Sequence, residues 1–361
     1  MRVFLITILF IALGNACRAS ADDTLPPGVA TRFLAFPFFL RSPETSWGFG
    51  GAGAYFFKSK KDDDTIRTSD INLISLYTLR KQFVVVLGST VFFPGENKIF
   101  RFQSSYSYYP DKFWGIGNET PDESEENYTM NQFFFNPQLI FRCYRKLFLG
   151  FSFEMQNVGN FSFEQGGIFD EQNISGKYGG FASGIGALFT WDTRNNAYSP
   201  SRGSFVELNA TRFTSALGSD FSFTSYVFDY RKFISVGRNR VLGAQLYSRV
   251  NKGDTPLRYL AMLGGPEMMR GYYKGRYTDQ NLLAGQAEIR QYLFWRLGIT
   301  GFLSAGQVAG AIHEFGLNDF HFTYGGGIRL LVNELEKLNL RVDFGFSKNS
   351  SGVYVLLKEA F

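Results

Sequence analysis

A two-residue alternation of apolar and polar side chains most constrains the fold of this 361-residue chain. In segment 338–347 the even-numbered residues from Leu338 to Phe346 are apolar, whereas Arg341 and Asp343 belong to the opposite face. Such a period is typical of β-strands. Because charged groups facing lipid are costly, the second face must line a wet interior. The pattern predicts a membrane-spanning β-barrel, with a soluble β-sandwich or propeller as the alternative.

Composition favours the barrel. Aromatic residues make up 18% of the chain, with 41 Phe alongside 39 Gly, yet the mean hydropathy is only −0.11. No stretch after residue 21 offers the roughly 18 consecutive apolar residues of a membrane helix, and barrel strands need none, because only alternate side chains face lipid. The formal charge of +5 is small and dispersed, so nucleic acid is not an expected partner.

Residues 1–21 are predicted to be a secretory signal peptide. Arg2 supplies the positive start, residues 3–13 the apolar core, and residues 19–21 a small-residue cleavage site. Lipoprotein processing at Cys17 is the alternative. A short periplasmic segment, 22–30, and a barrel, 31–361, are expected to follow. Of the two cysteines only Cys143 would then remain, which excludes an internal disulfide and leaves a small residue beside a turn.

The alternation delimits sixteen strand segments, an even number as single-chain barrels of this kind require. Long connections, at 110–126, 158–178, 251–280 and 310–319, all follow odd-numbered segments and therefore lie on one side of the membrane. With a periplasmic N-terminus, that side is the outside of a bacterial-type outer membrane. The predicted fold is an all-β, 16-stranded antiparallel transmembrane barrel. Its strands are expected near 31–41, 47–58, 67–79, 82–93, 98–109, 127–143, 146–157, 179–192, 203–213, 219–233, 239–250, 281–294, 298–309, 320–333, 338–347 and 352–361.

The connection between the eleventh and twelfth strands carries Arg270-Gly271-Tyr272. This tripeptide resembles the tip of the sixth outer loop in the BamA/TamA superfamily of outer-membrane assembly and secretion barrels, the bacterial surface antigen barrels. Other segments resemble that family in the same order and cover almost the whole chain. They are residues 36–50, the hairpin with Asp192, Arg194, Pro200 and Gly203, residues 285–290 and residues 302–306.

The resemblance implies that the sixth loop folds into the lumen and that Arg270 meets acidic groups on the next two strands. Glu288 lies on the inward face and can pair with the guanidinium, which needs a carboxylate when buried. Gly271 permits a tight bend, and Tyr272 can pack on the inner wall. Ser304 stands where the family has Asp. Arg270 is therefore expected to pair mainly with Glu288, or to gain a second partner from another inward group such as Asp343.

The last predicted strand ends in Phe361, which resembles the C-terminal signal by which barrels are themselves assembled. Val353, Val355 and Leu357 continue an outward face in step with it. Glu359 interrupts that face and is expected in the head-group zone, where charge costs little. The resemblance implies a loosened seam between the first and last strands, the family's proposed lateral gate. The Arg270–Glu288 lock is expected to stiffen the wall opposite that seam.

No enzyme, cofactor or metal site is expected. His313 and His321 are interpreted as loop residues without metal-site spacing, and no nucleophile–base arrangement is evident. Two acidic runs are read as solvated charge, although the second offers a surface site for divalent ions as the alternative. They are Asp62-Asp63-Asp64 and the outer-loop group of Asp122, Glu123, Glu125 and Glu126.

The resemblance implies a role in outer-membrane biogenesis, in which the barrel assists insertion or translocation of other outer-membrane or surface proteins. The family's periplasmic repeat domains find no counterpart ahead of the barrel segment. A partner that carries such domains, or a lipoprotein, is therefore expected alongside lipid and client proteins. The alternatives are a passive channel and a structural or anchoring barrel.

Overall fold

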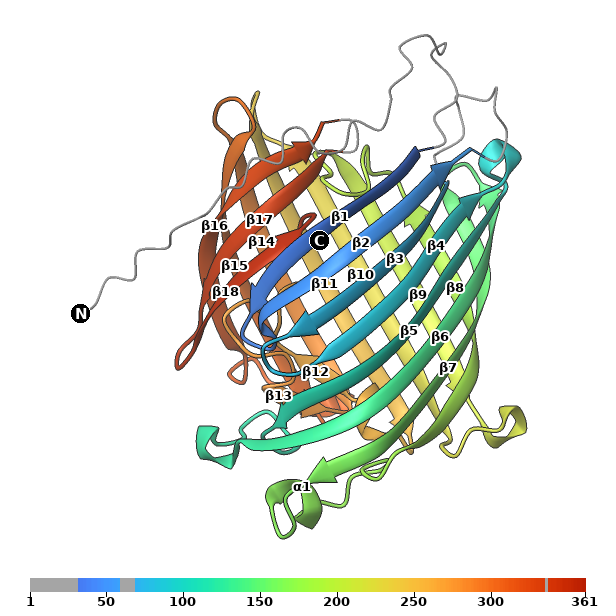
Figure 1. Ribbon diagram of the computed structural model, residues 1–361, viewed down its shortest axis with the longest axis vertical. Coiled ribbons are helices and arrows are strands. Elements are labelled where there is room, and N and C mark those ends of the chain that lie inside the picture. The colour runs from blue at the N-terminus through green and yellow to red at the C-terminus, as the bar shows by residue number, and fades with distance from the viewer. Residues whose placement is uncertain (1–31, 59–68, 335–336) are drawn as a thin grey trace, which may run out of the picture.

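The chain forms a closed antiparallel barrel of sixteen strands (Figure 1). The computed structural model describes residues 32–58, 69–334 and 337–361. Around the wall each strand pairs with its sequence neighbours, except that β11 pairs with β14 and β18 meets β1. The predicted strand number and antiparallel barrel are confirmed. The proposed signal peptide, the segment 22–30 and Asp62-Asp63-Asp64 lie outside the described residues.

The first eight wall strands run from β1 to β8. Their boundaries follow the alternation to within a few residues, although β5 and β7 extend further toward their long loops than expected. The strands are β1 (Arg32–Ser42), β2 (Ser46–Phe57), β3 (Ser69–Thr78), β4 (Phe83–Phe92), β5 (Lys98–Phe113), β6 (Glu126–Tyr144), β7 (Leu147–Phe163) and β8 (Gly180–Asp192).

The second eight wall strands enclose a long connection, residues 254–280, called loop 6 below. Loop 6 contains a small two-stranded sheet of β12 (Ala261–Leu263) and β13 (Tyr277–Asp279). A single α-helical turn, α1 (Ile168–Glu171), lies between β7 and β8. The wall strands are β9 (Gly203–Phe213), β10 (Phe223–Ser235), β11 (Arg240–Gly253), β14 (Asn281–Tyr292), β15 (Leu297–Ala309), β16 (His321–Asn333), β17 (Leu338–Phe346) and β18 (Ser351–Leu357).

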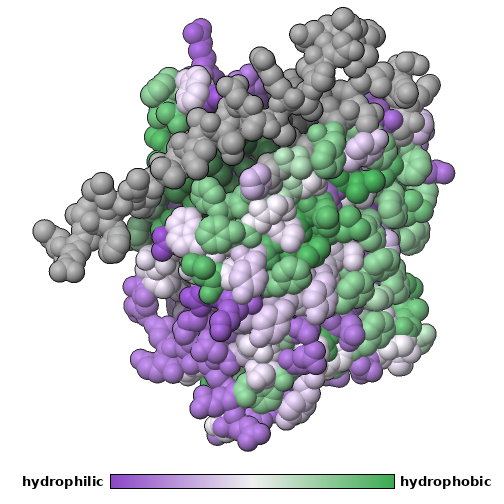
Figure 2. Space-filling model, viewed as in Figure 1, coloured by the Kyte–Doolittle hydropathy of each residue, from purple (hydrophilic) through white to green (hydrophobic). Residues whose placement is uncertain are grey.

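The two faces of the wall differ as the alternation requires. On β17, Asn339, Arg341 and Asp343 are buried toward the lumen, and the apolar residues between them are partly exposed on the outside. Large apolar side chains such as Phe151 and Leu303 are exposed on the outer surface. In Figure 2 apolar residues cover the upper part of the visible wall and hydrophilic residues gather at its lower end. The apolar band is the surface that lipid would cover.

The two ends of the barrel also differ. The long connections after β5, β7, β11 and β15 gather at one end, the lower one in Figure 1, called the loop end below. The shorter connections, such as Arg145-Lys146 between β6 and β7, lie at the opposite end, called the turn end. Long loops face outward in outer-membrane barrels. Among the described helices, none has the length and apolarity to cross a membrane.

The end of the chain departs from the predicted strand 352–361. β18 stops at Leu357, and Lys358 adopts a left-handed φ of 65°. Glu359 and Phe361 are then buried, with only 3% and 4% of their surfaces exposed. The prediction that Glu359 lies in the head-group zone is therefore wrong, as is the placement of Phe361 on the outer wall. Continued alternation would have turned the Glu359 carboxylate to lipid, whereas the lumen offers it cationic partners.

Candidate functional site: a buried arginine network in the lumen

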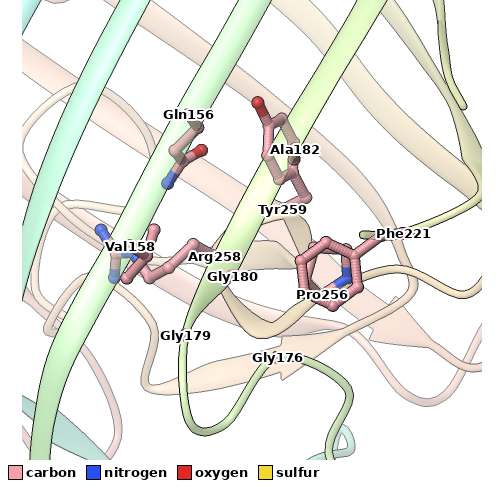
Figure 3. A pocket seen from close by; sticks show the side chains of 10 residues that line it. All are labelled: Gln156, Val158, Gly176, Gly179, Gly180, Ala182, Phe221, Pro256, Arg258 and Tyr259. Carbon is pink, nitrogen blue, oxygen red and sulfur yellow. The ribbon is translucent and has the colours of Figure 1, made fainter. Parts of the chain in front are cut away.

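Loop 6 enters the lumen next to the inner surface of β7 and β8. Figure 3 shows Pro256, Arg258 and Tyr259 of the loop close to Val158 and Gly180. The cavity between them measures about 10 Å³, room for one water molecule at most. The Tyr259 ring packs on Phe213 and Phe223, with ring centroids 4.7 and 5.1 Å away. The base of loop 6 is thus firmly packed on the wall.

Arg258 gives loop 6 a first polar anchor, on β5 and β6. Its Nη1 lies 3.5 Å from Asp111 Oδ2 and 3.3 Å from the Tyr128 hydroxyl, and its Nε donates to Gln132 Oε1 at 3.2 Å. Tyr273, further along the loop, donates to Asp111 Oδ1 at 2.9 Å. This anchor was not predicted. The alternation identifies inward residues on β5 and β6 but does not indicate which loop residue reaches them.

Arg270 gives loop 6 a second anchor, on the other side of the lumen. Its side chain is fully buried, with Nη2 at 2.7 Å from Glu288 Oε2 and Nη1 at 2.7 Å from Asp343 Oδ2. The guanidinium carbon lies 3.5 Å from the centre of the Phe302 ring, a close cation–π contact. Charge-assisted hydrogen bonds to two carboxylates offset the desolvation of the guanidinium.

The residues after Arg270 fit closely against β17 and β18. Gly271 has a φ of 123°, and its N–H donates to the Tyr354 hydroxyl at 2.9 Å. A Cβ at Gly271 would lie 2.8 Å from the Phe346 carbonyl carbon, and one at Gly345 would lie 2.5 Å from the Arg270 carbonyl carbon. The loop tip can approach the wall only because both positions are glycine. Tyr272 is buried and packs edge-to-face on Tyr277, with ring centroids 5.5 Å apart.

Ser304 is buried on the inner wall but does not hydrogen-bond to Arg270. Its backbone pairs with Gln286 in the β14–β15 ladder. Its buried hydroxyl has no hydrogen-bond partner within the described part of the chain. The second carboxylate that the lock lacks on β15 comes instead from Asp343 on β17.

The lock belongs to a larger buried network of charges. Arg290 donates to Glu288 at 2.8 Å, Arg329 donates to Asp343 at 2.5 Å, and Arg341 donates to Asp343 at 2.8 Å. Glu359 accepts from Arg329 Nε at 2.7 Å. Four arginines, with Arg270 included, therefore share three side-chain carboxylates. Each carboxylate has at least two cationic neighbours within 4 Å.

The last residues of the sequence complete this network from the turn end. Besides Arg329, Glu359 accepts a hydrogen bond from Asn339 Nδ2 at 2.7 Å. The Phe361 ring packs on Phe233 with centroids 5.9 Å apart. A main-chain carboxylate oxygen of Phe361, the last residue of the sequence, accepts from Arg290 Nη2 at 3.2 Å. Phe361 therefore lies in a lumenal cluster with Phe233 and Val241 instead of in a terminal strand.

The family-like hairpin between β8 and β9 reaches the same region. Asp192 and Arg194 form a two-point ion pair at 3.0 Å on each arm, and Gly203 has a φ of 107° that a side chain would strain. The Pro200 carbonyl oxygen lies 3.4 Å from Arg290 Nη1. The hairpin, the chain end and the base of the network are therefore in mutual contact. The sequence indicated each separately but not that they meet.

At the loop end, loop 6 is tied to other outer connections. Arg276 donates to Asp122 at 2.5 Å, and this hydrogen bond holds the pKa of Asp122 below its usual range. The backbone N–H of Lys274 donates to Glu44 Oε1 at 2.8 Å. Burial raises the pKa of Glu44, whose second carboxyl oxygen has no partner among the described residues.

Two expectations about outer residues are corrected here. Glu125 pairs with Lys112, and Glu126 accepts from the Phe169 N–H at 2.9 Å, so the acidic group is not merely solvated charge. His321 begins β16 and stacks on Tyr277 with ring centroids 3.8 Å apart, so it is not a loop residue. No cluster of potential metal ligands occurs in the described ranges.

The seam between β1 and β18 lies beside the lock. β1 pairs with β2 along its full length, from Arg32–Phe56 to Ser42–Ser46. To β18, over the residues described, it is joined by the single register pair of Arg41 and Val355. Arg270 contacts β14 and β17, and Gly271 contacts Tyr354 of β18 itself. The expectation that the lock stiffens the wall opposite the seam is therefore wrong.

Comparisons with known proteins agree with this architecture. Residues 84–352 match the family model described as the Omp85 superfamily domain. Solved structures similar to this chain include BamA from Haemophilus ducreyi lacking POTRA domains 1–3, with a TM-score of 0.59 and 10% identity over 91% of this chain and 70% of that one. CdiB from Escherichia coli gives a TM-score of 0.62 and 10% identity over 90% of this chain.

CdiB from Acinetobacter baumannii is also similar, with a TM-score of 0.56 and 12% identity over 90% of this chain. The chain spans 62% and 59% of the lengths of the E. coli and A. baumannii CdiB chains, respectively. No curated protein matches the sequence. At these identities the structures share a fold with this chain.

Proposed function

Because this chain belongs to the Omp85 superfamily, we propose that it assists the insertion or translocation of other outer-membrane or surface proteins. The resemblance to BamA/TamA-type barrels expected from Arg270-Gly271-Tyr272 is confirmed at the level of the family. The barrel would act as the membrane part of a larger assembly. Its substrates are extended or partly folded chains, not small molecules.

The observation that carries this proposal is the seam. The edge of β1 that faces β18 has one register pair, Arg41 with Val355, near the loop end, and no other within the described residues. Unpaired N–H and C=O groups along an exposed strand edge recruit another strand. A client strand could add to β1 without breaking an existing ladder there.

The filled lumen argues against a passive channel. Loop 6 crosses from the Arg258 anchor on β5 and β6 to the Arg270 anchor on β14 and β17. A cavity of about 470 Å³ remains beside it, lined by Glu44, Asp229, Arg231, Met262, Lys274 and Leu356 among others. This volume is that of a small-ligand pocket, and the loop would have to leave before the barrel could conduct freely.

The assembly would include a partner on the turn side. We propose that a protein with periplasmic domains, or a lipoprotein, delivers clients to the turn end. Because the β8–β9 hairpin contacts Arg290 of the network, a partner bound to this hairpin could affect the network inside the lumen.

Quantitative outer-membrane proteomics after depletion tests the proposal. Broad loss of other barrels is the expected result, and loss of one or two proteins would indicate a dedicated client. An unchanged outer membrane, together with steady conductance of the purified barrel, would contradict the proposal and favour the channel.

A seam-locked variant makes the test specific. Arg41→Cys with Val355→Cys in a Cys143→Ser background joins the observed register pair. Oxidation should abolish complementation of the depleted strain, and reduction should restore it. The matched control is Leu208→Cys with Phe228→Cys, which joins the continuous β9–β10 ladder. If the locked seam supports growth as well as the control does, clients do not enter through the seam.

A further inference from the structure

We propose that Glu359 is a positioning residue that holds the end of the chain inside the lumen and so keeps the turn-end half of the β1 edge free. The use of this free edge, to which a client strand would add, rests on the proposed function. The conformation itself does not depend on that function. The turn-end half of the β1 edge would then be unpaired in the resting barrel, without any further conformational change.

The chain turns into the lumen at a defined point. The Lys358 N–H still bonds to the Asn339 carbonyl oxygen at 2.8 Å, so the ladder with β17 reaches this residue. The left-handed φ of 65° at Lys358 then redirects the backbone, a conformation that costs free energy for a residue with a Cβ. The two 2.7 Å hydrogen bonds of Glu359, to Arg329 and Asn339, stabilise the turned conformation.

The alternation of β18 shows why a straight continuation is disfavoured. Gly352 and Tyr354 are buried on the lumenal side, and Val353 and Val355 are partly exposed on the outside. Odd-numbered residues therefore face outward, and an extended strand would turn Glu359 to lipid. A carboxylate in that position is unfavourable, whereas in the lumen it lies between two arginines.

The opposite strand disfavours closure at the same level. In an antiparallel ladder the register pair of Arg41 with Val355 would continue to Pro37 opposite Glu359. Pro37 has no N–H to donate, and proline is confined to strand edges for that reason. A ladder at this position would therefore cost free energy on both strands. It would lack the hydrogen bond that Pro37 cannot donate, and it would turn the Glu359 carboxylate to lipid.

The chain end is also coupled to the loop lock. Arg329 bonds to both Glu359 and Asp343. Arg290 bonds to both Glu288 and the main-chain carboxylate of Phe361. If the chain end left the lumen, both arginines would lose an acceptor beside the Arg270 lock. The open half of the seam and the position of loop 6 therefore stabilise each other.

Paired cysteines in a Cys143→Ser background distinguish the two positions of the chain end. Ala360→Cys with Val241→Cys reports the lumenal position, because these residues share one cluster. Ala360→Cys with Phe36→Cys reports a closed wall, since residue 36 would face residue 360 in the extended register. Arg41→Cys with Val355→Cys is the control that should form in every background.

The lumenal disulfide should form in the parent and the wall disulfide should not. With Glu359→Val and Pro37→Thr added, the wall disulfide should rise at least tenfold and the lumenal one should fall. A wall disulfide already present in the parent at the level of the 41–355 control would overturn the proposal. Failure of the wall disulfide to rise in a variant that still migrates as a folded barrel in unheated gels would also overturn it.

The comparison of the lumenal and wall disulfides in the parent still tests the proposal if the variant with Glu359→Val and Pro37→Thr does not fold. If the crosslinks behave as expected while depletion leaves the outer-membrane proteome unchanged, the conformation is right and the proposed function is wrong. The two failures are therefore separable.

Discussion

Arg270 and Glu288, eighteen residues apart in sequence, form an ion pair at 2.7 Å with neither side chain exposed. The pair links the tip of loop 6 to the wall strand that follows it. Glu288 lies within 4 Å of three arginines, Arg270, Arg290 and Arg329. Arg270 lies that close to two carboxylates, those of Glu288 and Asp343. The two partners therefore differ in the number of ion pairs that they form.

Glu288→Ala should destabilise the barrel more than Arg270→Ala. Loss of Arg270 removes two ion pairs from the network, whereas loss of Glu288 removes three. Removing one partner of a buried ion pair typically costs about 3–5 kcal/mol, and we expect Glu288→Ala at or above that range and Arg270→Ala below it. Urea unfolding in detergent, followed by unheated gel mobility, measures the difference. Equal losses of stability would show that the number of ion pairs removed does not determine the stability of the network.

Gly271→Ala should loosen the loop tip. The substitution combines a φ of 123° with a Cβ 2.8 Å from the backbone of Phe346, and the expected loss is about 1–3 kcal/mol. Gly51→Ala on β2 is the matched control, since its Cβ would have no atom within 4 Å. Limited proteolysis within loop 6 should increase for the first variant only. Comparable protease resistance of both variants would contradict the close approach of Gly271 to β17.

Glu44→Gln should stabilise the barrel at neutral pH. Burial raises the pKa of Glu44 above its ordinary value of 4.5, so its contribution to stability is complete below that pH and is lost as the pH rises through the folded-state pKa. The amide can still accept from the Lys274 N–H but does not ionise. The free energies of unfolding of the two proteins, measured by thermal unfolding, should therefore be similar near pH 4 and differ increasingly toward pH 8. The difference should reach about 1.4 kcal/mol for each unit by which the pKa of Glu44 is raised. A constant difference across this range would show that Glu44 ionisation does not matter.

Cysteine labelling of intact cells should report the orientation of the barrel. Leu317, 93% exposed in the connection between β15 and β16, lies at the loop end. The exposed Cys143 lies at the turn end of β6. A membrane-impermeant maleimide should label Leu317→Cys in a Cys143→Ser background, and label Cys143 in the parent only after the outer membrane is permeabilised. The reverse pattern would mean that the barrel is inserted the other way.

The alternation predicted the wall well, because lipid on one side and a wet lumen on the other impose the same period on every strand. It also placed Glu288, Arg341 and Asp343 on the inward face. It did not indicate which inward residues meet, since that depends on how far neighbouring strands are staggered. Arg258, Arg329 and Tyr354 were missed for this reason. The error at Glu359 arose from extending the last strand through a charge that the outer face does not tolerate.

The two anchors of loop 6 have a consequence for a barrel whose seam opens. Arg258 is fastened to β5 and β6, and Arg270 to β14 and β17, so a single connection bridges nearly opposite parts of the cylinder. Among the described residues, β1 and β18 are joined by the one register pair of Arg41 with Val355. If these two strands separated, loop 6 would still tie the two halves of the wall together across the lumen. The loop is therefore an internal tether that limits how far an opened seam can spread.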